Sequence, residues 1–154
     1  MRSNGLIFPQ NQLLGFVTLG ISKLGQFSMY GAKAYKSVDL NTAVISASPH
    51  ALITMLMDEA IKRMRLAKIH MEERHYADKG KCIGKAIQIV QEGLLASLNM
   101  EAGGEIAIRL RGLYEYITQQ LVLASARNDD ALLQLCIDLL MEIRGGWVEI
   151  AQEA

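Results

Sequence analysis

After Pro49 the chain contains no further proline, and this absence constrains its fold more than any other feature of the sequence. A proline inside a helix removes one backbone hydrogen bond, and its ring collides with the preceding turn. The stretch from residue 50 to residue 154 can therefore form long, uninterrupted helices. A chain of 154 residues usually makes one domain, which buries about two-thirds of its unfolded surface without a metal or a disulfide. We expect an all-α fold.

Apolar residues recur at spacings of three and four in four successive segments, which cover residues 48–75, 78–99, 104–126 and 129–152. This spacing places them on one face of a helix, so each segment is predicted to form an amphipathic helix. The connections between the segments are short, and short connections favour neighbouring helices that run in opposite directions. The predicted architecture is an antiparallel up-down four-helix bundle, with Trp147 in its core.

Residues at the segment borders are typical of helix ends. The side chain of Ser48 can accept a hydrogen bond from a free N–H in the first turn of the first helix. Paired glycines within residues 99–104 predict a turn, because helix interiors disfavour the backbone freedom of glycine. Asn128 or Asp129 is expected to cap the last helix. These border residues support four separate helices.

Residues 1–28 differ in composition from the rest of the chain. They are apolar, contain Arg2 and Lys23 but no acidic residue, and are interrupted by glycines. No A-x-A cleavage pattern follows, so a signal peptide is disfavoured, and the apolar run is too short and too broken for membrane insertion. We interpret residues 1–28 as a poorly ordered N-terminal extension and residues 29–154 as the four-helix domain. The alternative is that the extension folds back onto an apolar surface of this domain.

The charge balance disfavours a nucleic-acid partner. The chain has 16 basic and 16 acidic residues, and the basic ones form no recognisable stripe. A nucleic-acid-binding domain of this size usually has a basic excess. Cys82 and Cys136 are far apart in the sequence, which favours buried, reduced thiols over a disulfide.

The sequence contains no pattern that points to catalysis or to a bound metal. His70 and His75 are five positions apart, which is the wrong spacing for one helix face. Glu72 and His75 match one half of a ferritin-like Glu-x-x-His pattern, but no second copy pairs with them. The serines and glycines lack the contexts of a nucleophile elbow or a phosphate-binding loop. We therefore expect no enzyme activity, no cofactor and no metal.

The last three predicted helices carry more apolar residues than one core stripe requires. In the fourth helix, Leu132, Leu135 and Leu139 are assigned to the core stripe, and Leu133, Ile137 and Met141 are additional. An apolar face that remains after core packing is either covered by another segment or binds a partner. One interpretation is a site for an amphipathic peptide between helices. The other is a wide core covered by the N-terminal segment.

A series of short motifs occurs in a distinctive order between residue 29 and the C-terminus. The motifs are Met29-Tyr30-Gly31 with Ala34-Tyr35, Ser46-Ala47-Ser48-Pro49-His50, Lys79-Gly80 with Lys85-Ala86-Ile87, Asn99-Met100-Glu101 with Gly103-Gly104-Glu105-Ile106-Ala107, Leu113-Tyr114-Glu115-Tyr116, Arg127-Asn128-Asp129 and Trp147. In this order and spacing the chain resembles the flagellar secretion chaperone FliS family, over nearly all of residues 29–154. Residues 1–28 precede the usual start of that family.

The resemblance implies a bacterial chaperone of the cytoplasm rather than an enzyme. Its expected partner is the C-terminal segment of flagellin, which it would keep from polymerising prematurely and help deliver to the flagellar type III export gate. It also implies that the ligand lies in grooves formed by the second, third and fourth helices. Tyr30 and Tyr35 are expected to cover this groove or to contact the export gate.

The surplus apolar residues of these helices are the remaining expected partner-binding set. That set is Ile83, Ile87, Val90, Leu94, Tyr116, Leu123, Leu133, Ile137 and Met141. The four on the second helix could equally belong to the bundle core. The alternative function is a helical interaction module that binds another secretion partner or an anti-sigma factor. A small metalloenzyme is a further alternative, which bound iron or zinc would reveal.

Overall fold

The structure, a computed structural model, describes residues 47–153 and the side chains of residues 47–150. The helices are α4 (Pro49–Glu72), α5 (Tyr76–Gln88), the π-helical segment η2 (Ile89–Leu95), α6 (Met100–Arg127) and α7 (Asp130–Glu153). Within this range there is no strand, so the predicted all-α class is confirmed. The expectations for residues 1–28, Tyr30 and Tyr35 lie outside the described residues.

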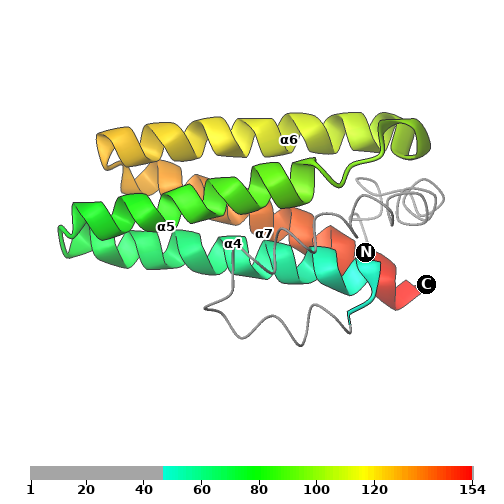
Figure 1. Cartoon of the computed structure of the whole chain (residues 1–154), viewed down its shortest axis with the longest axis horizontal. Helices are drawn as coiled ribbons and strands as arrows, with labels where there is room; N and C mark the ends of the chain where they lie inside the picture. The colour runs from blue at the N-terminus through cyan, green and yellow to red at the C-terminus, as the bar shows by residue number, and fades with distance from the viewer. Residues whose placement is uncertain (1–46, 154) are drawn as a thin grey trace.

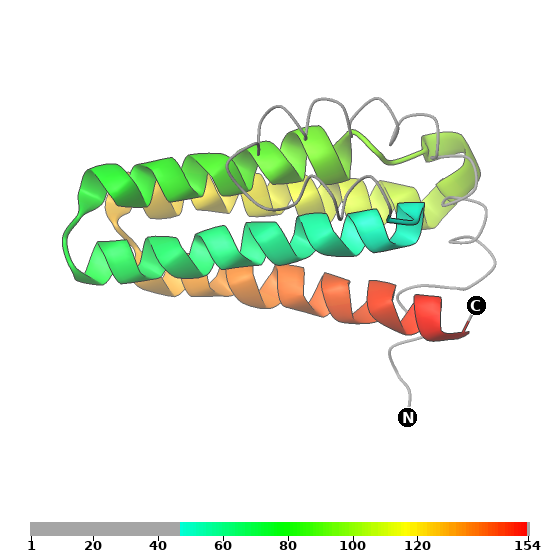
Figure 2. The ribbon, with the colours of Figure 1, turned by 60° about the horizontal axis from the view of Figure 1, so that its bottom comes forward.

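The helices form a four-helix bundle around one core. Both α4 and α6 pack against α5 and against α7, so the four helices form a closed ring. Figures 1 and 2 show that the chain reverses direction at each turn. The turn between α4 and α5 and the turn between α6 and α7 lie at one end of the bundle. The start of α4 and the end of α7 lie at the other end.

Side chains that accept backbone hydrogen bonds determine where the helices begin. Ser48 Oγ accepts from the N–H of Ala51 at 3.1 Å and caps α4 as predicted. Asp129 Oδ1 accepts from the N–H of Leu132 at 3.0 Å and caps α7. Asn128 ends α6 instead, because it adopts a left-handed conformation with φ of 49°. Asparagine tolerates this conformation better than most residues. Of the two predicted caps, Asp129 is therefore the one that begins the last helix.

The third helix begins earlier than predicted. Asn99 Oδ1 accepts hydrogen bonds from the N–H groups of Glu101 and Ala102, and α6 starts at Met100. In place of the predicted turn, the helix has a kink at Gly104, whose φ of 53° and ψ of −130° are not helical. Only glycine adopts this conformation without steric strain.

The second helix is not uniform. Residues 78–99 were predicted as one α-helix. The α-helix α5 ends at Gln88, and the following segment, Ile89–Leu95, is a π-helix. A π-helix has a wider turn than an α-helix and usually occurs in short pieces. It allows Ile89, Val90 and Leu94 to be buried together. A spacing rule built on 3.6 residues per turn does not predict such a segment.

One continuous hydrophobic core runs along the bundle. Trp147 is 2% exposed, which confirms its predicted place in the core. Cys82 and Cys136 are buried free thiols, as the sequence favoured. Burial raises the pKa of the Cys82 thiol, and it raises the pKa of Cys136 to about 11. Neither thiol is therefore activated as a nucleophile.

None of the described helices combines the length and the apolar character that crossing a membrane requires.

Candidate functional site

The structure places five of the predicted partner-binding residues in the core. Each is at most 1% exposed. They are Ile83, Val90, Leu94, Leu133 and Ile137. The physical reason is the closed ring of helices, because a helix that packs against two neighbours buries a wider face than a single stripe. Four residues of the second helix could equally have belonged to the core. Three of them do: Ile83, Val90 and Leu94.

The other four predicted residues are partly or largely accessible. Tyr116 is 43% exposed and Met141 is 44% exposed. Ile87 and Leu123 are half-buried, and Ile87 packs against the edge of the core. These four do not form one patch, because Ile87 lies on α5, Met141 lies on α7, and only Tyr116 and Leu123 share a helix.

On α6, the side that faces α5 is identified by a hydrogen bond. The ammonium group of Lys79 on α5 donates to the backbone oxygen of Ser125 at 2.7 Å and lies 3.4 Å from its hydroxyl oxygen. Leu123 precedes Ser125 by two positions, or about 200° around the helix, so its side chain points away from α5. Tyr116 is seven positions from Leu123 and shares its side of α6. Leu123 and Tyr116 therefore lie on the flank of α6 directed toward α7.

On α7, the side that faces α4 is identified in the same way. Arg65 on α4 donates through Nη2 to Met141 Sδ at 3.1 Å. Met141 therefore lies at the boundary between α4 and α7, apart from Tyr116 and Leu123. Leu139 is two positions from Met141, or about 200° around the helix, and points away from α4 toward α6.

The two flanks meet along the hairpin formed by α6 and α7. Cys136 Sγ donates to the Ile117 backbone oxygen at 3.8 Å, which aligns the middle of one helix with the other. Six apolar side chains on these two flanks are half-buried or exposed. We call them the α6–α7 surface: Leu113, Tyr116, Leu123, Leu132, Leu135 and Leu139. The surface offers hydrocarbon and phenol groups, so it can bind apolar side chains.

The predicted core stripe of the last helix was only partly right. Five of its members are buried as predicted: Cys136, Leu140, Ile143, Trp147 and Ile150. Leu132, Leu135 and Leu139 were also predicted to lie in the core, but Leu135 is 38% exposed and the other two are half-buried. Leu133 and Ile137, which were called additional, fill the core. The helix carries apolar residues around most of its circumference, so spacing alone does not determine its orientation. Tyr116 and Leu123 are the predicted residues that the structure brings to the α6–α7 surface.

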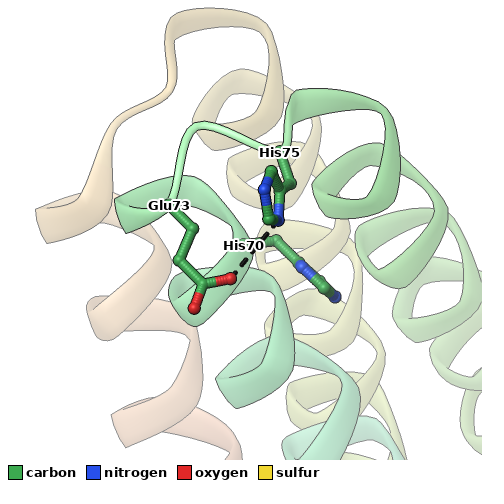
Figure 3. A group of neighbouring side chains, drawn as sticks. All are labelled: His70, Glu73 and His75. Atoms are coloured by element: carbon green, nitrogen blue, oxygen red, sulfur yellow. Dashed lines mark ion pairs between the residues drawn. The ribbon is translucent and has the colours of Figure 1, made fainter.

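His70 and His75 lie closer together than their spacing in the sequence predicted. The prediction assumed a continuous helix through His75, but α4 ends at Glu72 and the chain turns at Arg74, which has a φ of 63°. As a result, His70, Glu73 and His75 each offer a ligand atom within 4.8 Å of the others. Figure 3 shows the three side chains around this turn, with an ion pair of 3.3 Å between Glu73 and His75.

The comparisons with known proteins agree with this architecture. Residues 31–154 match the family model described as "Flagellar protein FliS". The flagellar secretion chaperone FliS of Salmonella typhimurium is 40% identical over 128 residues, which cover 83% of this chain and 95% of that protein. The flagellar secretion chaperone FliSB of Pseudomonas aeruginosa is also 40% identical, over 79% of this chain and 95% of its own length. The FliS of Bacillus subtilis is 29% identical over 77% of this chain and 84% of its own. This chain therefore belongs to the FliS family of flagellar secretion chaperones.

Proposed function

We propose that this chain binds the C-terminal segment of flagellin through the α6–α7 surface, in the bacterial cytoplasm. The observation that carries the proposal is the row of half-buried and exposed apolar side chains along α6 and α7 in a member of the FliS family. Three of them, Leu113, Leu132 and Leu139, also pack against the core. Such a row is typical of surfaces that bind an amphipathic partner segment.

The proposed mechanism is protection of an aggregation-prone segment. A free flagellin C-terminal segment would expose apolar side chains that other flagellin molecules could bind. The α6–α7 surface covers these side chains, which prevents premature polymerisation. Ordering a flexible segment costs part of the contact free energy, so binding remains weak enough for release at the flagellar type III export gate.

The N-terminal region is proposed to regulate access to this surface. Residues 1–28 form an extension, and residues 29–154 form the chaperone domain. The family match from residue 31 supports this division. Tyr30 and Tyr35 are proposed to cover the surface when it is empty or to contact the export gate.

The proposed activity is binding without catalysis. The similar proteins of Salmonella typhimurium and Pseudomonas aeruginosa are named as chaperones, which supports this proposal. Another secretion partner or an anti-sigma factor is the alternative ligand. A competition experiment compares the flagellin segment with such an alternative ligand. If both use the same surface, the flagellin segment displaces the other ligand.

The direct test is calorimetric titration of the full chain with a flagellin C-terminal peptide. The Tyr116→Glu variant should weaken binding by roughly tenfold or more, because tyrosines at interface centres often contribute about 2 kcal/mol or more. Tyr116 is largely exposed, so the variant should keep the helical circular dichroism of the wild type.

Ile69→Glu is the matched control, because Ile69 is 49% exposed but lies on α4. The proposal expects this variant to bind the peptide as the wild type does. Equal weakening by both substitutions, or no binding by the wild type, would refute the proposed site.

A further inference from the structure

The turn between α4 and α5 holds three side chains of the types that bind transition metals. His70 lies in the last turn of α4, Glu73 caps that helix, and His75 precedes α5. Within the part of the chain that the structure describes, this is the one group of three or more such side chains with ligand atoms close together. Imidazole nitrogens with one carboxylate form a common zinc ligand set.

The imidazole of His70 has one nitrogen with an unused lone pair or proton. Nδ1 of His70 is enclosed and has no hydrogen-bond partner among the described residues. A buried polar atom without a partner costs free energy, so such atoms in folded proteins usually have an explanation. A bound metal ion would supply the missing partner.

The backbone of the turn brings the side chains together. The N–H of His75 donates to the His70 backbone oxygen at 2.8 Å, which folds the chain back over the end of α4. Arg74 reaches this geometry with a φ of 63°, a conformation that costs free energy for a residue other than glycine. The side chain of His75 makes no capping hydrogen bond to α5, so it is available as a ligand.

The distances fit a zinc ion after a small adjustment. The three ligand atoms lie within 4.8 Å of one another, and Glu73 is already 3.3 Å from His75. Ligand atoms bound to zinc at about 2.1 Å in a tetrahedron are roughly 3.4 Å apart. The side chains of Glu73 and His75 are more than half exposed, so they can rotate to close the remaining gap. The C-terminal end of α4 adds partial negative charge that favours a cation.

We propose that His70, Glu73 and His75 bind one divalent transition-metal ion of the zinc type, with water in the remaining coordination position. The ion would join the last turn of α4 to the first turn of α5 and hold the turn closed. The site lies at one end of the bundle and contains none of the residues of the α6–α7 surface (Figures 1 and 3).

The test uses the full chain without a polyhistidine tag, treated with a chelator and titrated with zinc chloride in a calorimeter. The proposal expects one zinc ion per chain and a higher melting temperature in the presence of zinc. His70→Gln and His75→Gln should each weaken zinc binding by roughly tenfold or more and remove the increase in melting temperature. Both variants should keep the melting temperature of the metal-free wild type within a few degrees, because neither residue is in the core.

His50→Gln is the control, because it removes the third histidine at the far end of α4. It should leave zinc binding unchanged. Titration with cobalt(II) adds a spectroscopic check, since the imidazole and carboxylate site should give visible absorption without an intense thiolate band. Absence of stoichiometric zinc binding, wild-type affinity in His70→Gln or His75→Gln, a thiolate band, or loss of binding in His50→Gln would overturn the proposal.

Discussion

His50 and Trp147 join the first turn of α4 to the end of α7. Their rings stack with centroids 4.3 Å apart, and Trp147 Nε1 donates to the His50 backbone oxygen at 3.0 Å. Nε2 of His50 is enclosed and has no hydrogen-bond partner within residues 47–150. Burial lowers the pKa of His50, although a hydrogen bond with the backbone of Trp147 acts in the opposite direction. The folded protein therefore favours the neutral imidazole.

This residue predicts a pH-dependent stability. The unfolded chain, with the ordinary His50 pKa of 6.5, takes up a proton before the folded chain does. The free energy of unfolding should therefore decrease as the pH falls from 6.5 toward the lower folded pKa. Urea unfolding of the wild type and of His50→Gln on both sides of this pH measures the effect. The variant should show a smaller decrease, and parallel pH profiles would contradict the assignment.

At the scale of elements, the sequence predicted the number and approximate ends of the helices. Ser48 and Asp129 act as caps because their side-chain oxygens satisfy local N–H groups, and such interactions depend only on nearby residues. The predicted core stripe of α7 was correct at Cys136 and Leu140 but wrong at Leu135. Leu133 and Leu135 are equally apolar, and only packing decides which of them is buried. The closeness of His70 and His75 was missed because it depends on a left-handed residue, Arg74, that has no glycine-like signal.

The kink in α6 gives a prediction for an element. Gly104→Ala should destabilise the protein by about 1–3 kcal/mol, because alanine is strained at a φ of 53° and ψ of −130°. A Cβ atom there would meet no neighbouring atom, so the cost comes from the backbone alone. Denaturant unfolding monitored by circular dichroism measures the change.

Gly112→Ala is the matched control for this kink. Gly112 lies inside α6, and a Cβ atom there also meets open space. Alanine is favoured over glycine in a helix interior, so this variant should be more stable by up to about 1 kcal/mol. A stabilising effect at both positions would show that the kink at Gly104 is not required.

At the scale of the whole molecule, two pairs of helices close around one core and leave an apolar seam between α6 and α7. Polar bonds join α4 to α7 on the other side of α7, between Asp58 and Arg144 and between Lys68 and Asp130. The surplus of apolar residues was predictable from the sequence. Its location was predictable only in part, since Tyr116 and Leu123 were identified but the leucines of α7 were assigned to the core.

The central claim is that a flagellin C-terminal segment binds along this seam, and methyl NMR of the full chain tests it most directly. Addition of the peptide should shift the methyl signals of Leu123, Leu132 and Leu139, which lie on the two flanks of the α6–α7 surface. The methyl signals of Ile69, exposed on α4, should stay in place. Shifts at Ile69 with unchanged leucine signals on α6 and α7 would contradict the account.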